Sequence, residues 1–298
     1  AWILCQRRDG GWGYSTDAGP SPGGMTTAGI ASLYITGKSL ETRSESGFIN
    51  GQAPRCGRYA EHRPIAAGLS WLAQRFSVQR NPNGSWYYYY MYGVERVGIL
   101  SGQRYFGKHD WYRLGAAELV RRQSPDGRWE EQSGPIVNTS FALLFLAKGH
   151  KSILFNKLQW SSDQQWNLDR DDIAHLVAFL GDRLGSPVTW ETVRLDAPNE
   201  EWLAAPILYF NGHVFPRSND QPVEKLQEYV RQGGTILAEA CCGRREFVEG
   251  FRRFAARAWP EFELNRLAPD HPVFRSLFRL DGEKNHLEGI AVACRTSV

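Results

Sequence analysis

Long hydrophobic runs are missing from this sequence. Its 298 residues contain no uninterrupted apolar stretch longer than residues 141–147, whereas a helix that crosses a bilayer needs about 20 apolar residues. We therefore expect no membrane-spanning segment in this stretch of chain. The sequence begins at Ala1 without an initiator Met or a signal peptide and ends at Val298, so we expect it to be a fragment of a longer chain.

The sequence also has no large excess of charge of either sign. Lys and Arg number 35 and Asp and Glu number 32, which gives a net charge of +3. No basic stripe of the kind that nucleic-acid binding requires stands out. We therefore expect no nucleic-acid partner.

Cysteine is scarce, and its spacing is irregular. The chain has five cysteines: Cys5, Cys56, Cys241, Cys242 and Cys294. No pair of CxxC units is present, so the spacing predicts neither a zinc site nor a disulfide framework. We expect no metal and no cofactor.

Tryptophan, in contrast, occurs 11 times, and in the first half of the chain it recurs with the same neighbours. Residues 6–12 and 123–129 both read Gln-x-x-Asp-Gly-x-Trp, and residues 79–86 repeat the phrase with one extra residue and with Asn in place of Asp. We call these three segments the tryptophan turns. Asp-Gly and Asn-Gly pairs reverse the chain because Gly accepts a positive φ. Each segment is therefore predicted to be a turn between two helices, with the tryptophan covering the junction.

Apolar residues at three- and four-residue spacing flank these turns. The spacing predicts helices over residues 65–73 and 114–120 before a turn, and over residues 26–35 and 139–147 after one. The first half of the chain is thus predicted to be an array of helix pairs.

The tryptophan turns resemble the Q-W repeats of the terpene cyclase and prenyltransferase superfamily, whose helix pairs stack into an α-α toroid around a central cavity. The resemblance covers about the first 150 residues and implies a partial toroid over residues 1–155. In squalene and hopene cyclases the general acid belongs to a D-x-D-D motif, which residues 169–172 match. These residues have Arg170 at their centre and are interpreted as the start of a helix, where acidic residues are favoured. A cyclase or prenyltransferase activity is kept as an alternative in which the catalytic part is missing.

Aromatic residues cluster at the end of the second tryptophan turn, where Trp86 is followed by four consecutive tyrosines. Stacked rings can hold a cation, a sugar face or an apolar chain. The candidates for lining a ligand cavity are Trp86, Tyr88, Tyr92, Arg96, His109 and Trp111. Four consecutive tyrosines cannot all face inward on one helix, so packing between repeats is the competing interpretation.

From about Gln159 the pattern changes to short β-rich runs that alternate with amphipathic segments. The main elements predicted from it are strands over 187–193, 206–210 and 235–240 and helices over 169–184 and 222–232. Such alternation is typical of a mainly parallel sheet with helices on both faces. The predicted fold class is α plus α/β in two domains, with the α/β domain over residues 160–298.

Ligands of parallel sheets bind outside the carboxyl ends of the strands. Two predicted loops leave the sheet at such ends, and they contain Asn211 and His213 in the first and Cys241 and Gly243 in the second. Cys241 stands in a strand-turn-helix bend, which is the setting of a nucleophile elbow. A buried, inert cysteine pair is the competing interpretation for Cys241 and Cys242.

The second half resembles an uncharacterised bacterial domain family of class I glutamine-amidotransferase-like fold, often found in secreted or membrane-associated planctomycete proteins. The residues that carry the resemblance are 209–213, 233–243, 270–273 and 294–298. It implies a bacterial protein that is secreted or periplasmic. The amidotransferase elbow reads G-x-C-x-G, which aligns Cys241 with the nucleophile and Gly243 with the last glycine, while Glu239 replaces the first glycine. His213 or His286 would then be the base.

These observations support functions of different classes. The favoured one is a non-catalytic scaffold that binds a small molecule or a protein segment in the toroid concavity or at the strand edge. The alternative is a cysteine-dependent hydrolase or amidotransferase in which Cys241 attacks and His213 or His286 accepts its proton.

Overall fold

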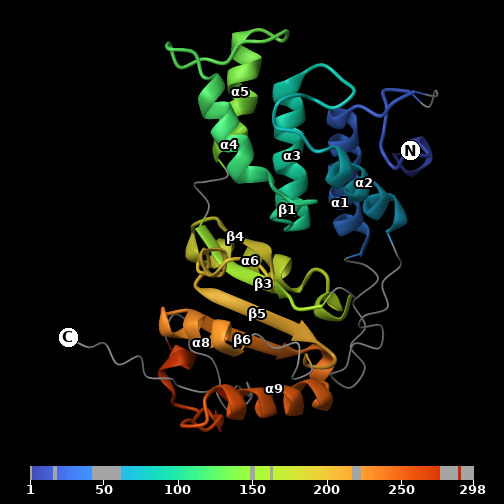
Figure 1. Ribbon diagram of the computed structural model, residues 1–298. Coiled ribbons are helices and arrows are strands. Elements are labelled where there is room, and N and C mark those ends of the chain that lie inside the picture. The colour runs from blue at the N-terminus through green and yellow to red at the C-terminus, as the bar shows by residue number, and fades with distance from the viewer. Residues whose placement is uncertain are drawn as a thin grey trace. The chain divides into compact units, whose positions relative to one another are not determined.

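The computed structural model describes residues 2–15, 19–41, 62–147, 152–161, 164–216, 223–275 and 288–289 (Figure 1). The helices of the first half are α1 (Gly23–Glu41), α2 (Arg63–Arg75), α3 (Tyr87–Ser101), α4 (Trp111–Arg122) and α5 (Pro135–Leu146). A short hairpin of β1 (Tyr105–Phe106) and β2 (His109–Asp110) precedes α4. All four helices expected around the tryptophan turns are present, with longer bounds than predicted.

The helices of the first half form two layers. The helices that follow a tryptophan turn are neighbours, since α1 packs against α3 and α3 against α5. The helices that precede a turn pack on this row, α2 on α1 and α4 on both α3 and α5. The sequence repeat is therefore also a repeat of packing.

Two of the three tryptophan turns have equivalent hydrogen bonds. The side-chain amide of Gln6 donates to the carbonyl of Gly10 at 2.8 Å, and that of Gln123 donates to the carbonyl of Gly127 at 3.0 Å. The two glycines have φ values of 88° and 83°, a region that L residues rarely adopt. Each glutamine thus closes a turn that only its glycine allows without strain.

The tryptophans of these two turns are held in the same way. The backbone N–H of Trp12 donates to Thr26 Oγ1 at 3.2 Å, and that of Trp129 donates to Thr139 Oγ1 at 3.1 Å. Each indole N–H donates to the carbonyl ten residues earlier, at 2.8 and 2.7 Å. Both rings are fully buried, which confirms that these tryptophans cover their junctions.

The middle turn departs from this pattern. Trp86 is 43% exposed and has a positive φ of 62°, so the prediction that it covers its junction is wrong. The buried Asn81 takes over the role of holding the neighbouring helix, because its Oδ1 accepts from the N–H of Gly24 at 3.0 Å. The extra residue in this copy shifts the tryptophan out of the core.

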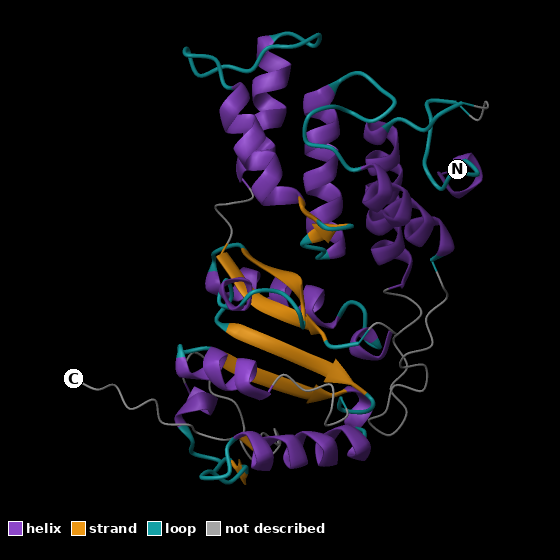
Figure 2. Ribbon diagram, in the orientation of Figure 1, coloured by secondary structure: helices purple, strands orange, loops and turns teal. Residues whose placement is uncertain are grey.

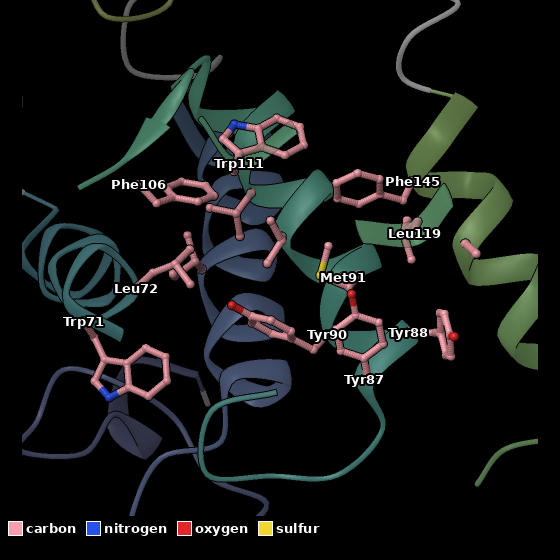
Figure 3. Close-up of a cluster of buried hydrophobic side chains, with 14 of the residues drawn as sticks. Trp71, Leu72, Tyr87, Tyr88, Tyr90, Met91, Phe106, Trp111, Leu119 and Phe145 are labelled. Carbon is pink, nitrogen blue, oxygen red and sulfur yellow. The ribbon is translucent and has the colours of Figure 1, made fainter. Parts of the chain in front are cut away.

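Aromatic and aliphatic side chains from α1 to α5 and from the tryptophan turns form one core (Figure 3). Within it, Trp111 is in edge-to-face contact with Phe145, with ring centroids 5.8 Å apart. Of the four consecutive tyrosines, Tyr87, Tyr88 and Tyr90 are buried, and burial raises the pKa of each of these phenols. These tyrosines therefore contribute to packing, as the competing interpretation expected.

The second half contains a four-stranded parallel sheet (Figure 2). Its strands are β3 (Ser152–Gln159), β4 (Val188–Arg194), β5 (Ile207–Gly212) and β6 (Thr235–Ala240), in the order β4-β3-β5-β6. Relative to their order along the chain this is 2-1-3-4, in which the winding direction reverses between β3 and β5. The last three strands match predicted runs, whereas β3 was not expected from the sequence.

Helices and short elements complete this half. They are η3 (Gln164–Asn167), α6 (Asp172–Leu184), α7 (Asn199–Trp202), α8 (Val223–Arg231), η5 (Cys241–Gly243), α9 (Arg245–Ala258), β7 (Asn265–Arg266), η6 (Pro272–Arg275) and β8 (Glu288–Gly289). No helix within the described ranges has the length and apolar character to cross a membrane.

The acidic residues Asp171 and Asp172 lie at the start of α6, as the sequence predicts. Helix α6 begins at Asp172, three residues later than predicted, and Asp171 makes no side-chain capping bond. The carboxylate of Asp172 instead pairs with the buried Lys157 of β3, with Nζ and Oδ1 2.7 Å apart. This motif therefore neutralises a buried cation.

Contacts divide the chain into two compact units, one of Ala1–Lys157 with Asp171–Val193 and one of Leu158–Arg170 with Arg194–Val298. This partition assigns α6 and β4 to the first unit. The two units therefore differ from the domains predicted from the sequence, 1–155 and 160–298. That domain organisation stays a prediction. The candidate site described next lies within the second unit.

Candidate functional site

Strands β5 and β6 end at the same edge of the sheet. They run parallel in register from Ile207 beside Thr235 to Gly212 beside Ala240. The next residues are His213 and Cys241, so the two loops leave the sheet side by side. The sequence prediction placed its candidate residues at such an edge for this reason.

The structure brings three potential ligand or catalytic groups together here. One ring nitrogen of His213 and the sulfurs of Cys241 and Cys242 all lie within 4.8 Å of one another. We call these three residues the thiol-imidazole cluster. Cys241 is only 3% exposed, whereas His213 and Cys242 are half-buried. Cys242, which was not among the predicted site residues, is thus the more accessible thiol.

The backbone of Cys242 is in the left-handed region, with φ 57° and ψ 27°. This conformation is disfavoured for a residue with a side chain, and it recurs at functional sites where surrounding structure maintains it. Gly243 follows with φ 65°, and a Cβ at this position would meet no atom within 4 Å. The backbone beside the thiols is therefore sharply turned and uncrowded on this side.

An aromatic cluster fixes both loops. Phe215, two residues after His213, is buried and packs edge-to-face on Phe247 and Phe251 of α9, with centroids 5.4 Å apart in each pair. Gly250 allows this approach, because a Cβ there would lie 2.7 Å from the Cβ of Phe215. Since α9 begins just after the Cys241–Gly243 turn, the same packing positions the histidine and the thiols.

Electrostatics favour a neutral imidazole in the cluster. Burial lowers the pKa of His213, the positive charge of Arg244 lowers it further, and Glu246 opposes both effects. A neutral imidazole can accept a proton or bind a metal ion. His213 is therefore in the form that either chemistry needs at neutral pH.

A chain of hydrogen bonds runs along one face of these strands. The amide of Asn211 donates to the hydroxyl of Tyr209 at 3.1 Å, and that hydroxyl donates to the carboxylate of Glu239. Asn211 is buried, and its Oδ1 has no hydrogen-bond partner among the described residues. Trp160, just after β3, donates its indole N–H to the backbone carbonyl of Asn211 at 3.2 Å. The residue after β3 and the end of β5, where the strand order reverses, are thus linked.

The other histidine considered as a base, His286, is outside the described residues. His271 accepts a hydrogen bond from the N–H of Val273 at 3.2 Å through its Nδ1, as a side chain that stabilises a local turn does. Of the candidate bases that the structure describes, only His213 lies in the thiol-imidazole cluster.

The aromatic candidates of the helical part occupy different environments. Tyr88 and Trp111 are buried in the core, and the indole N–H of Trp111 donates to the carbonyl of Gln103 at 2.6 Å. Trp86 is half-exposed at the start of α3. A ligand-lining role for these rings stays a prediction, while packing is their visible role.

One of the remaining candidates, Arg96, binds a buried acid that the sequence did not point to. Glu95 of α3 is fully buried and binds Arg96 through two hydrogen bonds of 2.5 and 2.6 Å. The guanidinium carbon of Arg96 lies 5.5 Å from the centre of the Tyr92 ring. His109 lies 5.7 Å from Phe76 between ring centroids. The only signal for Glu95 in the sequence is its place among apolar residues of a predicted repeat.

Comparison with protein families adds one similarity. Residues 154–293 match the family described as Domain of unknown function (DUF4159). No terpene cyclase or amidotransferase family was matched. No curated protein matched the chain. No solved structure matched it either. Residues 154–293, which include the thiol-imidazole cluster, are therefore similar to this domain family.

Proposed function

We propose that this protein is a ligand-binding scaffold whose binding site is the thiol-imidazole cluster of His213, Cys241 and Cys242. The observation that carries the proposal is the convergence of these three groups within 4.8 Å at the carboxyl edge of β5 and β6. This edge is where parallel sheets bind ligands. The buried, unsatisfied Oδ1 of Asn211 on the same strand end supplies an additional acceptor.

The test is a thermal-shift comparison that uses named probes. The melting temperature of the full chain is measured without a probe and with Zn²⁺, Mg²⁺, phosphate, glutamine or succinate. The same measurements are made on His213→Gln, on Cys242→Ser and on the control Cys5→Ser. Cys5 is a half-buried cysteine of the first unit, outside the cluster. At least one probe is expected to raise the melting temperature of the wild type and of Cys5→Ser and to leave both cluster variants unchanged. Equal shifts in all four proteins, or none, would refute the proposal.

For the helical part we propose an arc of an α-α toroid with a scaffolding role. Its support is the row of α1, α3 and α5 covered by α2 and α4, together with two tryptophan turns that have equivalent hydrogen bonds. Repeats of this kind need neighbours to bury their faces. A cyclase role would need an acid open to the concavity, and the buried Glu95 is instead engaged by Arg96.

Thiol catalysis is a second candidate, favoured by the left-handed backbone of the half-buried Cys242. In this case the thiolate adds to a carbonyl carbon, His213 accepts the thiol proton and returns it to the leaving group, and water hydrolyses the thioester. Cys241, the nucleophile expected from the G-x-C-x-G alignment, is less accessible to a substrate. A catalytic Cys242 would react with iodoacetamide much faster than a peptide thiol at neutral pH, and His213→Gln would slow it.

A further inference from the structure

The thiol-imidazole cluster has the composition of a transition-metal site. We propose that His213, Cys241 and Cys242 bind one thiophilic divalent cation, with Zn²⁺ as the reference ion, and that the fourth tetrahedral position is left for water or for a further ligand. This inference rests on the ligand-binding function proposed above and names the class of ligand. The irregular cysteine spacing gave no such indication, because the imidazole comes from a different loop.

The distances in the cluster are close to those of a zinc site. Zn–S bonds of about 2.3 Å and Zn–N bonds of about 2.0–2.1 Å in a tetrahedron place ligand atoms roughly 3.5–3.8 Å apart. The three candidate atoms lie within 4.8 Å of one another. Small side-chain rotations therefore suffice to complete the triangle of ligands.

The backbone explains how two adjacent cysteines can serve one ion. Successive residues in extended chain point to opposite sides, which would separate the two sulfurs. The left-handed conformation of Cys242, with φ 57° and ψ 27°, breaks this alternation immediately after β6. Both sulfurs then lie on the side of His213. A glycine would adopt this conformation more easily, so the side chain at position 242 has a use that offsets the strain.

The chemistry of the donors selects the class of ion. Thiolate and imidazole are ligands of zinc and related transition metals, whereas Mg²⁺ and Ca²⁺ require oxygen ligands. Two thiolates and a neutral imidazole carry a charge of −2, which a dication cancels. Charge cancellation favours the bound state in a site where one thiol is buried and the other groups are half-buried. A site with two cysteines, one histidine and an open position also allows a bound ligand to be polarised.

The experiment is a titration of the metal-free full chain with Co²⁺ under reducing conditions, followed by displacement with Zn²⁺. Thiolate ligation to Co²⁺ gives a sulfur-to-metal charge-transfer band, and tetrahedral geometry gives intense visible bands. We expect the intensity of both bands to rise until one ion is bound per chain. We expect His213→Gln and Cys242→Ser to weaken binding at least about 100-fold, since loss even of an outer-shell partner costs 10–100-fold.

Two controls isolate the site. Cys5→Ser, and a triple variant that also replaces Cys56 and Cys294 with Ser, are expected to bind the ion as the wild type does. Circular dichroism of each variant verifies that it is folded. Cys242 is replaced rather than Cys241 because substitution of a half-buried residue disturbs folding less than substitution of a buried one. Absence of the charge-transfer band in the wild type, or unchanged affinity in folded His213→Gln, would overturn the metal site.

Failure of this inference can be distinguished from failure of the proposed function. If no metal binds but another probe still shifts the melting temperature only when the cluster is intact, the ion is wrong and the binding site remains. If neither metal nor any other probe depends on the cluster, both proposals are refuted. Zinc-dependent protection of Cys242 from iodoacetamide would support the metal site over thiol catalysis.

Discussion

The tryptophan turn at residues 6–12 and the turn at Cys241–Gly243 both reverse the chain, but they use the left-handed backbone differently. In the first, a glycine holds that conformation, and hydrogen bonds from Gln6 and Trp12 satisfy the surrounding groups. In the second, Cys242 holds it despite its side chain, next to a thiol and an imidazole. The contrast leads us to expect that the strain at Cys242, which lies beside two other potential ligand groups, serves the proposed binding, whereas satisfied bonds around glycine indicate a structural role.

The largest expected effect tests the structural half of this comparison. Trp12→Ala and Trp129→Ala each remove a fully buried ring and its hydrogen bond, and should lower the free energy of unfolding by about 3–5 kcal/mol in urea denaturation. Trp86→Ala is the matched control, because its ring is half-exposed, and should cost less than about 1 kcal/mol. An equal loss in all three variants would contradict the distinction between the two buried tryptophans and the displaced one.

The next effect separates conformational strain from crowding within the tryptophan turns. Gly127→Ala adds a methyl that has only the Gln123 amide within 4 Å, so it should cost about 1 kcal/mol for the positive φ alone. Gly10→Ala places the methyl 2.7 Å from the carbonyl oxygen of Ala67 and should cost about 1–3 kcal/mol more. Urea unfolding of both variants measures the difference, and a larger loss for Gly127→Ala would reverse the interpretation.

The turn at Cys241–Gly243, where we propose binding, should respond in the opposite direction. Cys242→Gly removes the strain of the left-handed backbone, which should raise the free energy of unfolding by roughly 1–2 kcal/mol. The greater freedom of glycine in the unfolded chain should lower it by about 0.5–1 kcal/mol. We therefore expect the metal-free protein to become more stable by about 0.5–1 kcal/mol while binding at the cluster is lost. Cys242→Ala keeps the strain and should show no gain.

Another non-glycine residue with a positive φ provides the comparison for that result. Asn83 has φ 56°, but Asn tolerates this region better than other residues do, so Asn83→Gly should gain less than Cys242→Gly. If Cys242→Gly left stability unchanged or lowered it, the backbone at Cys242 would not be strained. The proposal that this residue is kept for binding at a cost in stability would then be refuted.

Local interactions explain which parts of the molecule could be predicted from the sequence. The Gln-to-Gly bonds of two tryptophan turns span four residues, so a short phrase encodes them. The edge position of His213 and Cys241 follows from strand alternation and parallel pairing. These features depend on residues near one another in the chain or on the general topology of parallel sheets.

The parts that were missed depend on distant partners. Strand β3 includes the buried Asn156 and Lys157, whose polar character hides the strand pattern, and Lys157 is acceptable only because Asp172 pairs with it. The left-handed backbone of Cys242 could not be predicted, because the usual sequence signal for this conformation is a glycine. Trp86 follows the repeat in sequence, yet a single extra residue moves its ring outward.

The smallest effect concerns how charge supports the first tryptophan turn. Burial opposes ionisation of Asp9, but hydrogen bonds from Ser21, from the N–H of Gly11 and from the Trp71 indole outweigh it and lower the pKa of this carboxyl. Because the folded-state pKa lies below the unfolded value of 3.8, the stabilisation is fully present above that value and is lost as the pH falls through the folded pKa.

Asp9→Asn tests this pH dependence and sharpens the contrast between equivalent turns. The wild type should be more stable than Asp9→Asn at pH 6, and the difference should shrink as the pH falls below 3.8, in urea unfolding at each pH. The equivalent Asp126 also has a lowered pKa, caused first by its hydrogen bond with Arg128, but its hydrogen bonds lie within its own turn, whereas those of Asp9 reach Ser21 and Trp71. Asp126→Asn should therefore have a smaller effect on stability at every pH, because an exposed pair contributes little. A larger pH-dependent loss for Asp126→Asn would show that the bonds from Ser21 and Trp71 to Asp9 do not carry the stabilisation.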